Sequence, residues 1–258
     1  MSLRVASGLL LLMAGQVHAG TVLKTVNRDL ANNQEMLSTT YAQQGSLRVE
    51  SGNSSGTVVI FKDDVLYTLD PKEKTYMMID RPTMQRVVQQ LSPVLKQMQE
   101  TLVKMPPEQR AKMEKLMGTS GGKPVVEQVR KTSRTDKIAG YACSYSEVLR
   151  DDVVSTEACV TAPAALKGSQ ELVDAAAKVA AFMKQLTEGL DVPFIRQMTE
   201  RQIDNFAELG GIPVQSRHFT DGKAVFESTL QSLSGTALPA TLFEVPEGYK
   251  RKELPMVR

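Results

Sequence analysis

The chain has 258 residues, of which 41% are hydrophobic and 23% are charged, and its formal net charge is +2. This composition can bury a core, which excludes a disordered chain, and the near balance of charge argues against a nucleic-acid-binding protein. Two histidines, two cysteines and no tryptophan leave few of the side chains that common catalytic and metal sites use.

The N-terminus predicts a secretory signal over residues 1–19. Arg4 supplies a short positive region, residues 5–15 form an apolar run, and Val17 and Ala19 place small residues at the −3 and −1 positions. We expect cleavage before Gly20 and a soluble periplasmic or secreted protein. The run is shorter than the roughly 20 residues that span a bilayer, and no later segment is long and apolar enough, so no transmembrane span is expected. The alternative is a buried first helix.

Strand patterns dominate the first third of the mature chain. Short alternating runs predict a β-meander over residues 21–80. From Asp80-Arg81-Pro82 onward, apolar residues recur at steps of three and four, which predicts a long helix that Pro93 should kink or split. A second helix is expected from Glu108 to Met117, followed by a loop over residues 119–123.

The second half repeats this alternation. Strands are predicted from Val125 to about Cys159, and a helical block from Ser169, a candidate N-cap, to Leu209. Two further strand runs flank Asp221-Gly222, which is the strongest short hairpin signal in the chain, and a last stretch covers residues 238–250. This order predicts an α+β fold, with an antiparallel sheet and two helical insertions packed against one face. No repeat or linker divides the chain, so we expect one domain over residues 20–258.

The two cysteines lie in strand-like runs on either side of Arg150-Asp151-Asp152. A hairpin centred on Asp151 would place Cys143 directly opposite Cys159, and export would allow them to form a disulfide. A redox-active thiol pair is the alternative, but the chain has no C-x-x-C motif and no histidine close by in sequence. We favour a structural bridge.

Motifs for catalysis or metal binding fail in context. Gly118-Thr119-Ser120-Gly121-Gly122 matches G-x-S-x-G, but a helix precedes it and strands follow, which inverts the nucleophile elbow. His218 is the only histidine of the mature chain, and the Asp pairs at 63–64 and 151–152 fit turns better than a calcium loop. We therefore expect no catalytic residues, no cofactor and no metal, although a site assembled from scattered carboxylates is not excluded by sequence.

Methionine is the remaining unusual feature, with 13 residues in the whole chain, many of them in predicted helices. Methionine fills irregular gaps in cores and also recurs on adaptable apolar binding surfaces. The simpler interpretation is ordinary core filling. The functional interpretation is a lining for an apolar ligand, for which the candidates are Met84, Val88, Leu91, Leu95, Met98, Leu102, Met105, Met183 and Met198.

Three segments resemble the DUF4412 family of exported bacterial proteins. They are Val65–Tyr76, with an Asp-Pro turn between strands; Lys137–Tyr145, with an I-x-G-Y-x-C pattern; and Leu242–Tyr249, with a closing F-x-V-P-x-G-Y. The resemblance implies an architecture like that of the LolA and LolB lipoprotein carriers, an open antiparallel half-barrel whose concave apolar face is covered by inserted helices. Cys159 stands where the family is expected to have an aromatic residue.

Three hypotheses of function follow. The first is a periplasmic, non-enzymatic carrier or binding protein for a hydrophobic ligand, such as a lipid or a lipoprotein acyl chain. The second is an interaction or sensor module for envelope proteins, without a small-molecule ligand. The third and least favoured is a hydrolase.

Overall fold

A single curved sheet organises the protein. The computed structural model describes residues 20–52, 56–116, 119–120, 123–124, 127–187 and 209–253. Within them, 12 strands form one sheet in the order β14-β6-β5-β4-β3-β2-β1-β13-β12-β11-β10-β9. The strands are β1 (Gly20–Asp29), β2 (Gln34–Gln43), β3 (Ser46–Ser51), β4 (Val58–Lys62), β5 (Val65–Asp70), β6 (Thr75–Ile79), β9 (Glu127–Ile138), β10 (Tyr141–Arg150), β11 (Val153–Thr161), β12 (Ile212–Thr220), β13 (Lys223–Thr236) and β14 (Lys250–Arg251).

Neighbouring strands of the sheet are antiparallel, except that β14 runs parallel to β6. Tight hairpins explain this topology. Five two-residue turns have positive φ at both central positions, which is the type I′ geometry that matches strand twist. These turns are Gln44-Gly45, Asp63-Asp64, Ala139-Gly140, Asp151-Asp152 and Asp221-Gly222.

The long helix predicted after Asp80 is α1 (Arg81–Lys104). Asp80 caps it, because its Oδ1 accepts a hydrogen bond from the Thr83 amide at 2.8 Å. Pro93 lies inside α1 without splitting it. α2 (Pro107–Leu116) follows as predicted, but the expected loop is partly strand, because β7 (Thr119–Ser120) pairs with β8 (Lys123–Pro124).

The second helical block begins with α3 (Gln170–Thr187), directly after Ser169. The Ser169 hydroxyl donates to the Pro163 carbonyl at 2.9 Å, and the amide of Val173 donates to the carbonyl of Ser169. The predicted continuation towards Leu209 falls largely on residues 188–208, which lie outside the described residues.

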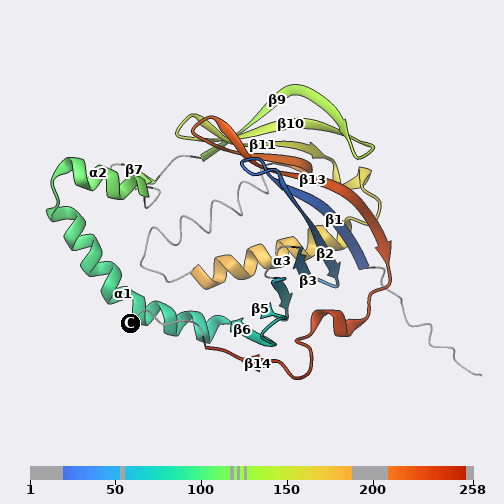
Figure 1. Cartoon of the computed structure of the whole chain (residues 1–258), viewed down its shortest axis with the longest axis horizontal. Helices are drawn as coiled ribbons and strands as arrows, with labels where there is room; N and C mark the ends of the chain where they lie inside the picture. Colours follow the sequence, from blue (N-terminus) through green and yellow to red (C-terminus); the bar gives the residue numbers. More distant parts are fainter. Residues whose placement is uncertain are drawn as a thin grey trace, which may run out of the picture.

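The helices lie on the concave side of the sheet (Figure 1). α3 lies within the curve and contacts β1, β2 and β3, whereas α1 contacts β6 and α3 and then leads away from the sheet towards α2. The ends of the strand order, β14 and β9, do not pair with each other. The expected fold class, an open and curved α+β half-barrel, is therefore confirmed.

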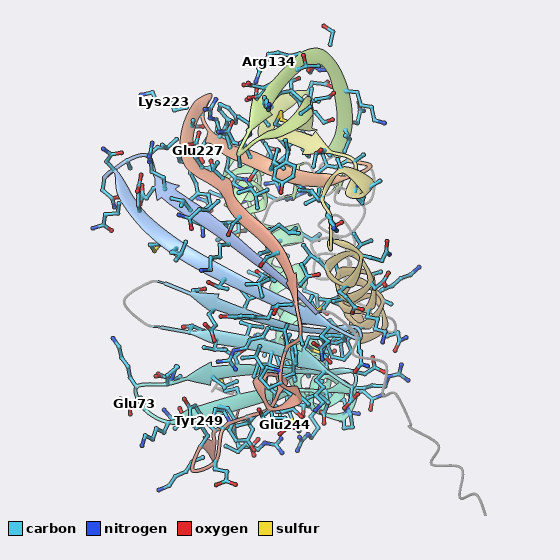
Figure 2. The ribbon with its side chains drawn as sticks, turned by 90° about the vertical axis from the view of Figure 1, so that its right-hand side faces the viewer. Glu73, Arg134, Lys223, Glu227, Glu244 and Tyr249 are labelled. Carbon is cyan, nitrogen blue, oxygen red and sulfur yellow. A yellow bond between two sulfur atoms is a disulfide. The ribbon has the colours of Figure 1, made fainter. Side chains whose placement is uncertain are left out.

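The convex side is covered at one end by a segment that the sequence did not assign, residues 238–251, called the C-terminal strap below. It contains a short 3₁₀ helix, η2 (Ala240–Phe243), and β14. Phe243 is buried against Val58, Ile60 and Leu69 of the sheet. Figure 2 shows Glu244 and Tyr249 of the strap at the opposite end of this face from Arg134 and Glu227.

The predicted disulfide is present, but the predicted register is wrong. Cys143 and Cys159 are bridged, with Cα atoms 5.3 Å apart. The turn is formed by Asp151 and Asp152 together, and the register of β10 against β11 shifts at a bulge next to Leu149. As a result, the residue opposite Cys159 is Tyr145. The bridge therefore joins diagonal positions, two residues from the directly opposed pair that a hairpin centred on Asp151 would give.

Candidate functional site

The concave face beneath α3 carries a row of apolar side chains that crosses five neighbouring strands. Each member is the direct cross-strand partner of the next. In order from β2 to β6, the row is Ala42, Leu47, Phe61, Leu66 and Ile79. Ala42 and Phe61 are buried, Leu47 between them is half-buried, and Leu66 and Ile79 at the β6 end are two half-buried residues side by side. The covering of this apolar row is thus less complete at its β6 end.

Helix α3 provides the cover. Phe182 and Leu186 are buried against Phe61, and the rings of Phe61 and Phe182 lie 5.3 Å apart between centroids. Met84 from α1 and Met183 from α3 pack against the same cluster. The Arg81 side chain donates to Gln185 Oε1 at 2.8 Å, so the first turn of α1 is also tied to α3 by a polar contact.

The candidate lining residues are only partly brought together. Met84 and Met183 meet in the cluster around Phe61, where they fill the core between α1, α3 and the sheet. Leu102 and Met105 are half-buried at the far end of α1. The remaining candidates fall outside what the structure describes: Val88, Leu91, Leu95 and Met98 lie on α1 with side chains that are not described, and Met198 is outside the described residues. The lining itself stays a prediction.

Sequence reasoning missed the strand half of this surface. The sequence pattern places Leu47, Phe61, Leu66 and Ile79 in the predicted meander, but it does not show that they line one strip. The signal that identifies them is register, because two-residue turns at Gln44-Gly45 and Asp63-Asp64 align these residues across the strands. Turn length sets this alignment once the hairpins are recognised.

The opposite, convex face carries a second ordered row, made of charges. Residues along β1 alternate in direction, and Thr21 donates to the Gly168 carbonyl just before α3, so Arg28 points away from α3. Its row crosses seven strands, and each residue is the direct partner of the next: Arg130, Glu147, Glu157, Arg217, Glu227, Arg28 and Glu35.

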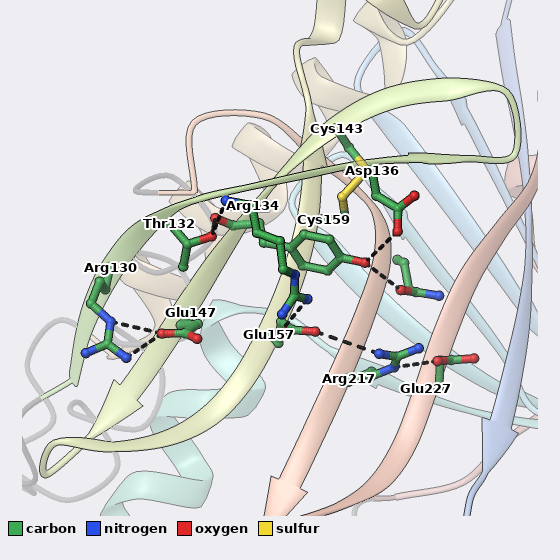
Figure 3. A network of polar contacts seen from close by, with 12 residues as sticks. Arg130, Thr132, Arg134, Asp136, Cys143, Glu147, Glu157, Cys159, Arg217 and Glu227 are labelled. Carbon is green, nitrogen blue, oxygen red and sulfur yellow. Dashed lines mark hydrogen bonds and ion pairs between the residues drawn. A yellow bond between two sulfur atoms is a disulfide. The ribbon is translucent and has the colours of Figure 1, made fainter.

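The charged side chains of this row pair with one another, and Figure 3 shows the pairs between β9 and β13. Arg217 lies 2.6 Å from Glu227 and 3.9 Å from Glu157, and Arg130 and Arg28 pair with Glu147 and Glu35. Arg134 joins from a bulge in β9, 2.8 Å from Glu157. With Arg134 included, four arginines balance four glutamates, so the row fits a role in holding strand register better than a role in binding a charged ligand.

A buried tyrosine anchors this network to the disulfide. Tyr145 lies opposite Cys159, and its hydroxyl is 3.2 Å from Asp136 Oδ2 and 3.4 Å from Gln215 Oε1. The Arg134 guanidinium lies 3.6 Å from the centre of its ring. Hydrogen bonding to Glu157 raises the pKa of Arg134 above its ordinary value, so the cation is retained.

His218 does not show the arrangement of a general base. Its Nδ1 lies 3.1 Å from the Thr156 hydroxyl and its ring packs beside Phe226. Burial lowers its pKa, which favours the neutral ring at neutral pH. Among the described residues, no group of three or more His, Cys, Asp or Glu side chains is placed to hold a metal ion. Likewise, no helix in the described part of the chain is long and apolar enough to cross a membrane.

Comparison with known proteins adds little beyond this outline. No protein-family model and no curated protein matches the chain. An uncharacterised conserved protein from Thermus thermophilus is 8% identical with a TM-score of 0.47, over 92% of this chain and 91% of that one. The Pseudomonas aeruginosa MucA/MucB complex is 10% identical with a TM-score of 0.39, over 90% of this chain and 56% of that one. MucB alone gives 11% and 0.39, over 91% and 60%.

These likenesses are too distant to carry an inference about function, and this chain spans less than two thirds of the MucB chains. The structure itself defines the class: an α+β protein built on an open, curved antiparallel sheet with helices on its concave side. Its disulfide is typical of compartments outside the reducing cytosol. The predicted signal peptide lies outside the described residues, and the resemblance to the DUF4412 family stays a prediction.

Proposed function

We propose that this protein is a non-enzymatic binding or carrier protein of the periplasm or the extracellular space, and that it holds a hydrophobic ligand, a lipid or an acyl chain, on its concave face. The observation that carries the proposal is the apolar row from Ala42 to Ile79. It is continuous across five strands, it contains no polar side chain, and its cover is incomplete at the β6 end.

The dimensions of the row suit an extended hydrocarbon chain. Neighbouring strands lie about 4.8 Å apart, so five strands give a strip about 19 Å long. A chain laid along this strip would meet apolar atoms throughout, at about 0.8 kcal/mol for each buried methylene. A strip without hydrogen-bonding groups selects apolar character rather than a particular headgroup.

The cover can exchange for a ligand at low cost. Met84 and Met183 are flexible and tolerate rearrangement, and Met84 belongs to the first turn of α1, beside the half-buried end of the row. A ligand entering between α1 and β6 would replace contacts of methionine and leucine with contacts of the same apolar kind. We therefore place the entry at Ile79 and Met84.

Lipid extraction and native mass spectrometry of protein purified from its own host test the proposal first. Uptake of a fluorescent fatty acid or phospholipid then tests the site. Ile79→Gln should weaken uptake at least tenfold, because it places an amide in the apolar row. Met78→Gln is the matched control, because Met78 is the neighbouring half-buried residue on the opposite face of β6. Circular dichroism should show that both variants fold.

Repeatedly empty protein and no uptake of any apolar probe would contradict the proposal. In that case crosslinking in cells decides for the alternative, an envelope interaction or sensor module, if a specific protein partner is captured. Turnover in a broad esterase and glycosidase screen would instead favour a hydrolase. Equal losses in Ile79→Gln and Met78→Gln would place the ligand elsewhere.

A further inference from the structure

Positive charge is concentrated on the two helices that leave the sheet. The segment from Arg81 to Leu116, called the helical arm below, contains seven Lys or Arg residues and three Glu residues, which gives a formal charge of +4 (7 − 3). The whole chain carries only +2, so the remainder is −2. The arm is therefore the positive pole of a nearly neutral molecule.

The lysines of the arm differ from the arginines of the sheet in whether they form ion pairs. On the sheet, Arg130, Arg134 and Arg217 each face a glutamate within 4 Å. On the arm, Lys96, Lys104 and Lys112 are exposed, and within the described residues none of them forms an ion pair. The arm's charge is thus available to an external anion.

Exposed apolar side chains lie among these lysines. Val94, Val103 and Met113 are 49%, 67% and 39% exposed, and they make up three of the six large hydrophobic residues that are exposed in the described part of the chain. Val103 and Lys96 are seven residues apart and so lie on the same side of α1. Val103, the most exposed of the three apolar residues, therefore shares one side of α1 with a cation.

The arm is also placed where a large partner can reach it. α1 is tied to the core near its first turn, through Met84 and the Arg81–Gln185 contact, and its other end leads to α2 away from the sheet (Figure 1). At the junction the Arg110 guanidinium donates to the carbonyls of Val103 and Met105, at 2.8 and 3.1 Å, which fixes α2 to the end of α1.

We propose that the helical arm docks on the surface of an anionic lipid bilayer. Each lysine near such a surface contributes attraction whatever its detailed geometry, and a nearby valine or methionine can insert between headgroups. A protein partner is less favoured, because lysine is depleted in the cores of protein interfaces and the arm has no Tyr, Trp or Phe to act as an anchor. The inference goes beyond the proposed function and does not depend on it.

Vesicle co-sedimentation tests the arm with the full chain. The protein should bind mixed phosphatidylglycerol/phosphatidylcholine vesicles, bind pure phosphatidylcholine vesicles at least tenfold more weakly, and dissociate at high salt. The triple variant Lys96→Glu/Lys104→Glu/Lys112→Glu should bind anionic vesicles at least 100-fold more weakly, because three attractions are lost and three repulsions replace them. The matched control is Lys131→Glu/Lys137→Glu/Lys223→Glu, which makes the same charge change at exposed positions of β9 and β13. It should lose less than about threefold, since charges beyond the roughly 8 Å screening length at physiological salt contribute little.

Equal losses in the two triple variants would overturn the inference, as would equal binding to neutral and anionic vesicles. Binding to polyglutamate without binding to vesicles would also overturn it and would indicate an acidic protein partner. Fluorescent-lipid uptake in solution, measured on the same variants, keeps the two proposals separate. Vesicle docking without uptake leaves the arm as proposed and removes the carrier, whereas uptake without docking does the reverse.

Discussion

Several residues of the hairpin turns have left-handed backbones without being glycine. Aspartate tolerates this region, which accounts for Asp63-Asp64 and Asp151-Asp152, but alanine has no side-chain hydrogen bond to compensate. Ala139 adopts φ +50° at the turn between β9 and β10. It is therefore a residue whose backbone is poorly suited to its position.

Ala139→Gly should stabilise the protein by about 0.5–1 kcal/mol, because glycine relieves the left-handed conformation that alanine resists. Thermal unfolding should show a rise of about 1–4 °C in Tm. Ala142→Gly is the control: this exposed alanine lies inside β10, where glycine should lower stability. A fall in Tm for Ala139→Gly would contradict the argument from backbone strain.

Asp80 provides a residue-scale test that depends on pH. Hydrogen bonding from Thr83 lowers the pKa of Asp80 below its ordinary value of 3.8. Its stabilisation of α1 is therefore present above the unfolded pKa and is lost as pH falls through the folded pKa. In urea unfolding, Asp80→Ala should cost about 1 kcal/mol at pH 7 and progressively less in acid. Asp80→Asn keeps an oxygen cap and should cost less, and its cost should fall in acid in the same way, because both variants lack the titrating carboxyl group. If the cost of Asp80→Ala were the same at pH 7 and in acid, the ionised carboxylate of Asp80 would not be what stabilises α1.

At the scale of elements, the disulfide joins two strands that the turn already pairs. It closes a loop with 15 intervening residues (16 − 1), and Cys143 and Cys159 are both buried. The chain-entropy model gives about 3 kcal/mol for such a loop. Cys143→Ser/Cys159→Ser should therefore lower Tm by several degrees under oxidising conditions. Reduced wild-type protein is the control, since it loses the bridge without a change of residue. Identical Tm values for oxidised and reduced protein would show that the bridge contributes nothing.

The elements show which features can be predicted from sequence. Local signals sufficed for the meander, for α1 and α2, and for the hairpin at Asp221-Gly222, because turn residues and periodicity act over short distances. The pairing of Cys143 with Cys159 was predicted, but its diagonal register was not, since register depends on a bulge near Leu149 that the residue types do not announce.

The candidate site was harder to predict for the same reason. The methionines of α1 and α3 were found from helical spacing, whereas the apolar row of the sheet needed the alignment of five strands. Phe61 and Ile79 are 18 residues apart, and only the register of two hairpins makes them members of one strip. The C-terminal strap was also missed, because its parallel pairing with β6 joins residues that are about 175 positions apart in sequence.

At the scale of the whole molecule, the two faces of the sheet differ in the side chains that they carry. On the convex face, the charges of the row from Arg130 to Glu35 pair with one another once Arg134 is included. The concave face carries the apolar row beneath α3, and the excess positive charge lies on the helical arm. A carrier that takes an apolar ligand from an anionic surface needs both features on one side, and α1 belongs to both.

The C-terminal strap covers the β6 edge of the sheet. Its release should therefore expose that edge and allow the protein to associate with itself. The amides of Lys250 and Lys252 donate to the carbonyls of Lys74 and Tyr76, so the strap occupies the outer edge of β6. Phe243, 3% exposed, anchors it. Phe243→Ala should cost about 3 kcal/mol through lost burial, and it should release the strap before the rest of the sheet unfolds.

Hydrogen exchange should detect this release as faster exchange at the Lys252 amide, while the amides of β10 and β11 stay protected. Light scattering should then show concentration-dependent association, because the uncovered edge of β6 offers unpaired backbone groups to a second chain. Glu244→Gln is the control, because it removes only the exposed contact with Lys62 at 3.2 Å and should leave both measurements unchanged. If Phe243→Ala lowered stability while the Lys252 amide stayed protected and the protein stayed monomeric, the strap would be part of the core rather than a separable guard of the β6 edge.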